Sequence, residues 1–460
     1  MKLIMKFGGT SVDGAEKIQH VSEIIKRFYD SGNQIVVVIS AMAGVTDELI
    51  NLMSKAAEQK WSEVLEGLES LKERHWKAIE AIKDKALKQK ALNSTEKLIE
   101  ELKGFLKGIL IIKELTPRAR DYILSFGEQL STNIVSLKLR DLNVPSKYLT
   151  GWEAGIVTDS SFGSAKPIMS VTERKVREVI EPLLSTGVVP VVTGFIASTE
   201  NGYITTLGRG GSDYTASILG AVLKADEIWI WTDVDGIMTT DPKIEPNAKT
   251  IAKLSYDEAA ELAYFGAKVL QPYMIKPAKD RGVPIRVKNT FNPQCDGTLI
   301  TRVEEIETEE KIVKAIGINN NISIFTIRDL DIHSLKEVIN LIEKLVEDTD
   351  VILLSQSFPK GNLSIVIPKE KGADVLRKIN ELVKFKIECE NDVSLIAVVG
   401  SGMKGTPGVA AKIFQAVAEK GINIKMIAQG PSELNISFIV KKSDSEEAVR
   451  AIHKKFKLGG

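Results

Sequence analysis

The first residues that could do chemistry lie in a glycine-rich turn near the start of the chain. Lys6, Gly8 and Gly9 belong to the segment KFGGTS, between an apolar run and a helical pattern. Two glycines let a backbone approach a ligand closely, and a lysine supplies a compact positive charge. The turn therefore suits an anion such as a phosphate group, although an ordinary turn with a solvated lysine fits the hexapeptide equally well. It is not a P-loop, because the chain contains no Gly-Lys dipeptide.

A second glycine-rich turn, TLGRGGSD at residues 206–213, surrounds Arg209 and precedes a helical pattern. A guanidinium group flanked by glycines can bind a carboxylate or phosphate through two hydrogen bonds, and a helix N-terminus adds partial positive charge. Ser212 or Asp213 could cap that helix. We favour anion binding over a structural turn, on the argument that three glycines around one arginine serve no packing purpose.

Acidic side chains follow another apolar run. Thr232, Asp233 and Asp235 lie in the segment TDVDG. Carboxylates at the end of a strand suit ribose hydroxyls or a hydrated magnesium ion, and a plain turn fits equally well. A calcium loop is excluded, because the glycine comes three residues after Asp233 rather than five and the twelfth position is Ile244.

Two more charged residues lie beside glycines in helical patterns. Gly127 should cost about 1 kcal/mol relative to alanine within a helix, so something must need the space. A close neighbour would explain the glycine equally well, and Glu128 alone would more often be a solvated acid than a ligand. Lys268 follows a helix that we expect to begin at a capping box formed by Ser255 and Glu258.

Residues 400–405, GSGMKG, match the dinucleotide-binding fingerprint. The next expected strand, residues 422–428, ends in Gln429 and Gly430 without the acid that binds ribose. About sixty residues also cannot hold a doubly wound sheet. We therefore reject a dinucleotide site here.

The elements that must position these residues are those of an α/β protein. Up to about residue 300, short β-branched runs alternate with helical patterns, which predicts a three-layer sandwich with a mostly parallel sheet. The clearest strands are expected at residues 2–7, 35–40, 188–193, 227–232 and 284–288. Residues 47–113 are rich in helix formers and predict a helical excursion from the sheet.

The rest of the chain contains an internal repeat of strand, helix, strand, strand, helix. Its first copy is expected at 323–327, 334–346, 351–355, 363–367 and from 373, and its second at 394–399, 408–420, 422–428, 436–440 and from 445. Residues 289–310 resemble a linker. We therefore expect domains at 1–302, 311–388 and 389–460.

Composition excludes several classes of protein. Across 460 residues, 61 basic side chains balance 61 acidic ones, so no global field favours nucleic acid or an anionic membrane. Two cysteines and four scattered histidines argue against disulfides, structural zinc and Cys/His catalysis. With no long apolar run, the sequence predicts a soluble, cytoplasmic protein.

Together these motifs resemble the aspartate kinase family, within the amino-acid-kinase fold. The resemblance covers essentially the whole chain. Its segments are residues 6–12, 40–42 with Thr46, 126–128, 208–213, 232–236 and 266–270, followed by paired ACT modules of the α+β, ferredoxin-like kind. Each motif alone is weak, but the order and combination are specific.

The resemblance implies transfer of the ATP γ-phosphoryl group to the side-chain carboxylate of L-aspartate. The products would be 4-phospho-L-aspartate and ADP, in the first step of lysine, threonine and methionine biosynthesis. An acceptor carboxylate with a pKa of ~4 is already ionised at neutral pH, so no histidine base is needed. The barrier is then electrostatic and positional.

The resemblance also implies roles for individual residues. The catalytic residues would be Lys6, Arg209 and Asp213. Aspartate would be bound by Ser40, Thr46, Glu128 and Arg209. The nucleotide would be bound by Lys6, Gly8, Gly9, Thr232, Asp233, Lys243, Lys268 and Val269, with Mg²⁺ held mainly by phosphates and water rather than by a protein metal site. The chain departs from the common pattern at Met238, Lys243 and Gln271, which affects details of nucleotide contacts.

In the family, ACT modules dimerise and bind a feedback amino acid, here lysine or threonine, so a homodimer or a dimer of dimers is expected. The glycines of residues 400–408 could receive the effector's carboxylate. Asp329, Gln356 and Gln429 are candidate effector contacts, with exposed turn residues as the alternative. The first module has RDLD at 328–331 where the second has its glycine loop, so unequal effector binding is expected.

Two other functions remain open. One is a non-catalytic amino-acid sensor, which the intact Lys6, Arg209 and acidic positions argue against. The other is a kinase acting on glutamate, acetylglutamate or UMP, which the ACT pair and the opening heptapeptide disfavour.

Overall fold

The computed structural model describes residues 1–265, 270–303, 311–328, 352–357, 362–382 and 386–459, with some side chains left out beside the gaps. The described chain forms two compact units. The first comprises Met1–Gly236 and Tyr273–Val303, and the second comprises Ile237–Pro272 and Glu304–Gly460. None of the described helices is long and apolar enough to cross a membrane.

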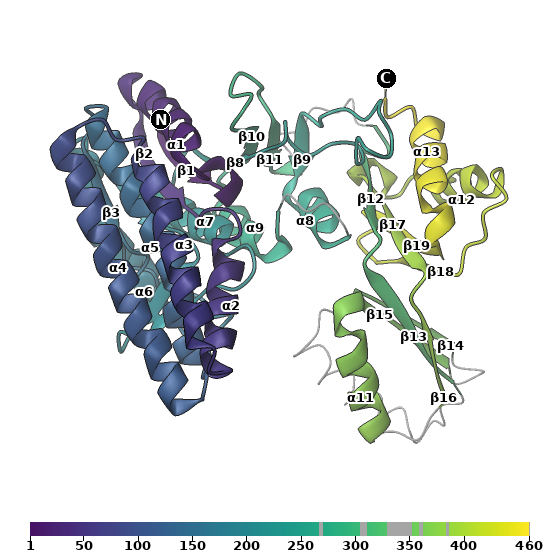
Figure 1. Cartoon of the computed structure of the whole chain (residues 1–460). Coiled ribbons are helices and arrows are strands. Elements are labelled where there is room, and N and C mark those ends of the chain that lie inside the picture. Colours follow the sequence, from purple (N-terminus) through teal and green to yellow (C-terminus); the bar gives the residue numbers. More distant parts are fainter. Residues whose placement is uncertain (266–269, 304–310, 329–351, 358–361, 383–385, 460) are drawn as a thin grey trace. The chain divides into compact units, whose positions relative to one another are not determined.

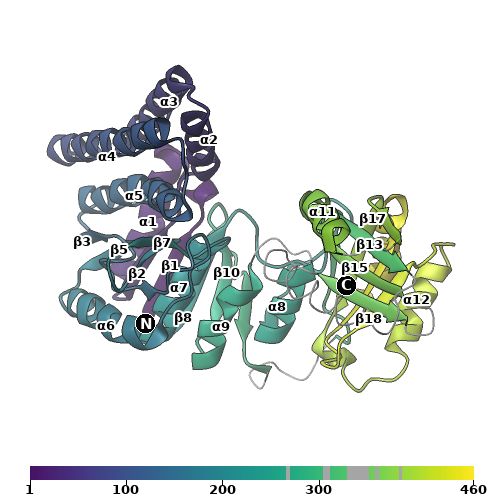
Figure 2. The same ribbon diagram turned by 90° about the horizontal axis from the view of Figure 1, so that it is seen from below.

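A mostly parallel sheet forms the centre of the first unit (Figure 2). Its strands run in the order β3 (Ser146–Leu149), β5 (Val189–Thr193), β2 (Gln34–Ile39), β1 (Lys2–Phe7), β8 (Glu227–Thr232), β10 (Ile285–Asn289) and β11 (Thr298–Thr301). Neighbours pair in parallel except β10 with β11. The central strands are buried along nearly their whole length, as expected for a sheet covered on both faces. The predicted fold class is confirmed.

Helices cover both faces of this sheet. One face carries α1 (Ala15–Asp30) and α5 (Pro117–Asp141), and the other carries α6 (Met169–Ser185), α7 (Gly211–Leu223) and α9 (Pro272–Arg281). A smaller sheet contains β4 (Val157–Thr158), β6 (Ile196–Thr199) and β7 (Ile204–Thr206).

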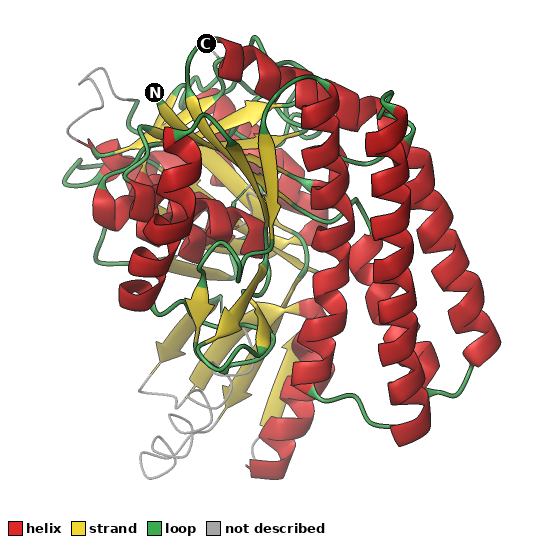
Figure 3. Cartoon of the chain, turned by 90° about the vertical axis from the view of Figure 1, so that its left-hand side faces the viewer, coloured by secondary structure: helices red, strands yellow, loops and turns green. Residues whose placement is uncertain are grey.

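The predicted helical excursion is confirmed. It comprises α2 (Val45–Ala57), α3 (Trp61–Ile79) and α4 (Lys85–Ile112), which stand beside α5 as long neighbouring helices (Figure 3). Their apolar faces, with Leu49, Leu68 and Leu71, join the same core as the sheet. The excursion is therefore an integral part of the first unit.

The second unit contains two antiparallel four-stranded sheets (Figure 1). One runs β12 (Ala315–Asn319), β17 (Val393–Val399), β19 (Asn435–Lys441), β18 (Met426–Gln429), and the other runs β14 (Leu353–Ser357), β15 (Asn362–Pro368), β13 (Ile322–Arg328), β16 (Lys386–Glu390). Helices α12 (Val409–Ala418) and α13 (Ser445–Lys455) share a core with the first of these sheets. Helix α11 (Gly372–Leu382) follows β15 of the second sheet in the chain. The helix expected at 334–346 lies outside the described residues.

Each of the two four-stranded sheets contains one strand that lies next to the other copy of the repeat in the sequence. β12 precedes the first copy of the repeat but pairs with β17 of the second, whereas β16 leads into the second copy but pairs with β13 of the first. Neither β12 nor β16 was predicted from the sequence. The domain bounds inferred from the sequence therefore remain a prediction. The second unit also contains β9 (Lys253–Ser255) and α8 (Tyr256–Phe265).

Candidate functional site

The candidate site lies where β1, β2 and β8 end. Because these strands are adjacent and parallel, their carboxyl ends meet at one edge of the sheet, where ligands bind in open α/β folds. Lys6 lies near the end of β1, Ser40 directly follows β2, and Thr232 ends β8. The fold thus brings together three residues that the sequence placed far apart.

Lys6 forms an ion pair within this edge. Its Nζ lies 2.5 Å from Oδ1 of Asp213, which is in the first turn of α7. Lys6 is only 9% exposed. A Cβ built on Gly8 would lie 3.6 Å from the same Nζ, so the ammonium group lies beside bare backbone. Lys6 is thus held in one place, next to a turn that leaves room for an anion.

Gly9 lies where two loops of the site come close together. A Cβ on Gly9 would lie 2.6 Å from the carbonyl oxygen of Ala41 and 3.1 Å from the amide nitrogen of Ala43. Only glycine allows the loop after β1 to lie this close to the loop after β2. In the structure Gly9 therefore sets the spacing of two loops.

Glu128 is a buried acid, which contradicts the alternative of a solvated one. It projects from α5 and is 4% exposed. Oε1 accepts a hydrogen bond from the Ala41 amide at 3.2 Å, while Oε2 has no partner among the described residues. Burial raises the pKa of Glu128 to about 8, against the opposing effect of the Ala41 amide. A buried carboxyl group with a spare oxygen is well suited to receive a cation.

The neighbouring residues define the rest of this part of the site. Ser131 donates a hydrogen bond to the Ser40 carbonyl oxygen at 2.7 Å, which fixes the loop after β2. Ser40 and Thr46 are both half-buried, and Thr46 lies in the first turn of α2. The predicted aspartate-binding residues Ser40, Thr46 and Glu128 are thus all on elements that meet at this loop.

Gly127 is required by a close neighbour, which was one of the two explanations that the sequence left open. A Cβ at this position would lie 2.9 Å from Cβ of Ala41. We expect Gly127→Ala to destabilise the protein by about 1–3 kcal/mol through overpacking, despite the better helix propensity of alanine. Urea unfolding measures this change.

Gly104 provides the matched control, because it lies within α4 and a Cβ at its position would meet nothing within 4 Å. Gly104→Ala should stabilise the protein by about 0.5–1 kcal/mol. If both substitutions shifted the urea midpoint equally, the packing explanation for Gly127 would be wrong.

The glycines around Arg209 do serve the backbone and packing, which corrects our expectation. Gly208 and Gly210 have φ angles of +76° and +71°, and a Cβ on Gly211 would lie 2.7 Å from the Phe195 ring. α7 is capped by Gly210 without a side-chain hydrogen bond, so the predicted cap by Ser212 or Asp213 is wrong. Its first-turn acid pairs with Lys6 instead.

Arg209 itself remains available for a ligand. It is exposed, and no hydrogen bond or ion pair joins it to the rest of the described chain. Phe195, which no pattern in the sequence marked, follows β5 with a φ of +66°, and its carbonyl oxygen accepts a hydrogen bond from the Leu207 amide in the same turn at 2.8 Å. Such an angle is uncommon for a residue with a side chain, and strained backbone of this kind gathers at functional sites.

The acids after β8 differ in their surroundings. Asp233 is exposed and accepts a hydrogen bond from the Thr232 hydroxyl at 3.2 Å. Asp235 accepts hydrogen bonds from the side-chain amides of Asn289 at 2.9 Å and Asn292 at 3.1 Å. Asp235 therefore ties the turn after β8 to the end of β10 and the segment after it, and Asp233 is the acid left open to a ligand.

The remaining predicted residues belong to the second unit or lie outside the residues that the structure describes. Lys243 belongs to the second unit and is exposed. Lys268, Val269 and Asp329 lie outside the described residues, as does the side chain of Gln356. Among the residues that the structure describes, no three His, Cys, Asp or Glu side chains are grouped as metal ligands.

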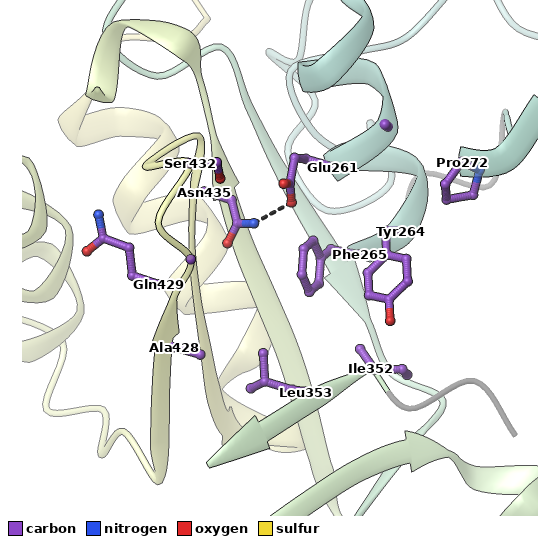
Figure 4. Close-up of a pocket in the computed structure, with 12 residues that line it drawn as sticks. Glu261, Tyr264, Phe265, Pro272, Ile352, Leu353, Ala428, Gln429, Ser432 and Asn435 are labelled. Atoms are coloured by element: carbon purple, nitrogen blue, oxygen red, sulfur yellow. Dashed lines mark hydrogen bonds between the residues drawn. The ribbon is translucent and has the colours of Figure 1, made fainter. Parts of the chain in front are cut away.

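Gln429 borders a pocket in the second unit (Figure 4). The cavity has a volume of about 490 Å³ and lies between α8, the start of β14 and the end of β18. At one end Glu261 accepts a hydrogen bond from Asn435, and the rings of Tyr264 and Phe265 line another wall. Burial raises the pKa of Glu261. The structure thus places one candidate effector contact at a cavity.

The glycine loop at 400–405 binds carboxylates of its own chain. The Ser401 amide donates to Glu258 Oε1 at 2.7 Å, and the Gly405 amide donates to Glu433 Oε2 at 2.8 Å. A Cβ on Gly400 would lie 2.4 Å from the Ile312 carbonyl oxygen. These two amides are therefore not available to an effector carboxylate.

Glu258 also forms the predicted capping box, which is confirmed. Its amide donates to the Ser255 hydroxyl at 3.1 Å, and its Oε2 accepts from the Ser255 amide at 2.8 Å. Lys314 lies 3.1 Å from the same carboxylate. These contacts hold the pKa of Glu258 below its usual value in spite of burial.

The sequence and the fold are similar to those of known proteins. Residues 1–289 match the model of the amino acid kinase family, and residues 396–456 match an ACT domain. The chain is 35% identical to aspartokinase 2 of Arabidopsis thaliana, a chloroplastic protein, over 98% of the chain and 84% of that protein. It is 33% identical to the aspartokinase of Bacillus sp. (strain MGA3), over 100% of the chain and 98% of that protein.

Two solved structures of Escherichia coli aspartokinase III are similar over 99% of both chains. The complex with aspartate and ADP, in the R-state, matches with a TM-score of 0.85 at 29% identity. The complex with lysine and aspartate, in the T-state, matches with a TM-score of 0.81 at 28% identity.

Proposed function

The chain belongs to the amino acid kinase family and, within it, to the aspartokinases, and from this premise we propose how its own residues transfer the ATP γ-phosphoryl group to the side-chain carboxylate of L-aspartate. The single observation that carries the proposal is the meeting of a fixed cation and a buried acid at one sheet edge. Lys6, paired with Asp213, lies beside the loop after β1. Glu128, with a spare carboxylate oxygen, bonds the loop after β2, and the two loops lie against each other at Gly9.

Lys6 neutralises the phosphates as charge builds up during transfer. Asp213 holds the ammonium group in place, so little reorganisation is needed when the nucleotide binds. Gly8 keeps the backbone beside Lys6 bare, which leaves space for phosphate oxygens. The site therefore suits ATP because a fixed cation lies next to backbone without side chains. ATP would supply the phosphoryl group.

Glu128 receives the α-ammonium group of aspartate. One oxygen of Glu128 has no partner in the described chain, and the pKa of this carboxyl group is raised because it is buried. The substrate's ammonium group would supply the cation that Glu128 lacks. Arg209, exposed and without a partner in the described chain, binds a substrate carboxylate. Ser40 and Thr46 complete the contacts. The acceptor is already ionised at neutral pH, so no base is required.

The remaining nucleotide contacts of the proposal come from Gly9, Thr232, Asp233, Lys243, Lys268 and Val269. Magnesium would be held mainly by the phosphates and water, and the exposed Asp233 is an acid that could contact this ion or its water. The oxygen ligands that Mg²⁺ prefers are then mostly the nucleotide's own.

The ACT modules make this enzyme a feedback-regulated one. We propose threonine or lysine as the inhibitor, because one similar Escherichia coli structure contains lysine. Asp329, Gln356 and Gln429 stay the candidate contacts. A homodimer or dimer of dimers through these modules, a cytoplasmic location and domains at 1–302, 311–388 and 389–460 belong to the same proposal.

The experiment that tests this function measures ADP release from magnesium ATP with different acceptors. We expect turnover with L-aspartate, and at most background with glutamate, acetylglutamate, UMP or no acceptor. Lysine and threonine are then added separately, and suppression by one of them identifies the inhibitor. Nucleotide binding without aspartate-dependent turnover would instead support a non-catalytic sensor.

A further inference from the structure

Arg74 of α3 connects the helical excursion to both loops of the candidate site. Its Nη2 donates to Asp13 Oδ1 at 2.6 Å and to the Ala43 carbonyl oxygen at 2.5 Å. Asp13 lies in the segment that follows β1 and carries Gly8 and Gly9, whereas Ala43 lies in the loop that follows β2. One guanidinium nitrogen therefore joins the two loops.

The two loops lie backbone against backbone where Arg74 joins them. The missing Cβ of Gly9 allows this approach to Ala41 and Ala43. At the base of the loops, the Ser40 amide donates to the Phe7 carbonyl oxygen at 3.2 Å. Hydrogen bonds hold the two loops together at this spacing, and Arg74 supplies two of them.

The backbone of Arg74 is itself fixed by its neighbours. Next to it, His75 is fully buried, and its ring Nδ1 lies 2.7 Å from the Leu71 carbonyl oxygen. Burial lowers the pKa of His75 to about 4, so the ring is neutral and does not repel the guanidinium group at pH 7. The helix thus presents Arg74 from a rigid base.

We propose that Arg74 is a positioning residue for phosphoryl transfer, which fixes the loop that binds the phosphates relative to the loop that binds aspartate. This inference rests on the proposed function. In the proposed function the phosphates lie mainly at the loop after β1 and aspartate mainly at the loop after β2. Each substrate therefore still binds without Arg74, but the reacting atoms lose their alignment. A misplacement of about 1 Å can reduce a rate about 10²-fold.

The test compares three variants of the full-length protein. Arg74→Met keeps an unbranched stem but removes the donors, and Arg74→Lys keeps a charge and donors. Lys77→Met, on an exposed position of the same helix, is the matched control. The side chains of Arg74 and Asp13 are 33% and 31% exposed, so water can solvate the groups left behind and the fold should persist.

We expect Arg74→Met to reduce kcat about 10- to 100-fold, while the Kd for ADP and the KM for aspartate change less than about threefold. Arg74→Lys should recover part of the rate, and Lys77→Met should behave as the wild type. Asp13→Ala should add little to Arg74→Met, because both remove the same contact. If Arg74→Met unfolds, Arg74→Lys and Asp13→Asn provide the same comparison.

Hydrogen exchange gives a readout that does not depend on activity. Amides of residues 8–14 and 40–46 should exchange faster in Arg74→Met but not in Lys77→Met. An unchanged kcat in folded Arg74→Met overturns the proposal, whether or not exchange changes. If the wild type does not phosphorylate aspartate, the proposed function fails, and unchanged exchange would show separately that Arg74 does not hold the loops.

Discussion

Replacing Lys6 with methionine should reduce kcat for aspartate-dependent ADP release by at least about 10³-fold. Removing one fixed group that stabilises transition-state charge typically costs 10²–10³-fold, and Lys6 is a full charge in a nearly buried position. Lys6→Arg should not restore the rate, because a planar guanidinium group does not fit the place of a compact ammonium group beside Asp213.

A control must separate this effect from unfolding. Lys6→Met leaves Asp213 buried without its cation, which can destabilise a protein by about 3–5 kcal/mol. The double variant Lys6→Met/Asp213→Asn removes both charges and should be more stable than the single variant, yet equally inactive. A folded double variant with near-normal kcat would show that the Lys6 assignment is wrong.

Replacing Glu128 with glutamine should raise the KM for aspartate about 10²-fold or more and change the KM for ATP little. The carboxylate would form a charge-assisted hydrogen bond with the substrate's ammonium group, which a neutral amide cannot replace. Steady-state kinetics with each substrate varied in turn measures the difference. Equal effects on both KM values would contradict the assignment.

The pH dependence gives a second test of Glu128. Its pKa is raised from 4.5 to about 8, so between these pH values the folded protein holds a proton that the unfolded chain has released. The free energy of unfolding therefore receives a contribution that falls as the pH rises through this window, and Glu128→Gln should remove it. Urea unfolding of both proteins between pH 5 and 8 measures the change.

Substrate binding should show the opposite trend with pH. An ammonium group beside Glu128 favours its ionised form, so aspartate binding releases a proton below about pH 8. The apparent affinity for aspartate should weaken as the pH falls, by up to about tenfold per unit, and Glu128→Gln should abolish this slope. A wild-type affinity independent of pH would contradict the raised pKa.

The sequence predicted the sheet well because buried parallel strands leave a clear pattern. Strands such as β1, β2 and β8 are short apolar runs between helical patterns, and the helical excursion is equally plain. The capping box of Ser255 and Glu258 was predictable because it is formed within four residues. Local signals therefore gave reliable local elements.

Contacts between distant segments left no such signal. Strand β12 pairs with β17 and strand β16 pairs with β13, although each lies closer in the sequence to the other copy of the repeat. Packing in the folded unit decides this pairing. Arg74 lies on a helix rich in charged residues, where nothing in the spacing marks it as different from Lys72 or Lys77. Only the fold brings it to Asp13 and Ala43.

Glycines were the hardest residues to interpret. Those around Arg209 suggested a ligand site, yet Gly208 and Gly210 adopt positive φ angles and Gly211 packs against Phe195. Gly400 likewise faces backbone rather than a ligand. A glycine can indicate that a side chain would not fit at its position. The sequence alone does not show whether a ligand or another part of the protein occupies that space.

Trapping the product tests the central claim most directly. An acyl phosphate formed on the side chain of aspartate reacts with hydroxylamine to give a hydroxamate, which can be quantified by mass spectrometry beside ADP. We expect aspartyl β-hydroxamate in an amount equal to the ADP released, and neither product above background with Lys6→Met. ADP release without the hydroxamate, or hydroxamate formation that persists in folded Lys6→Met, would contradict the account.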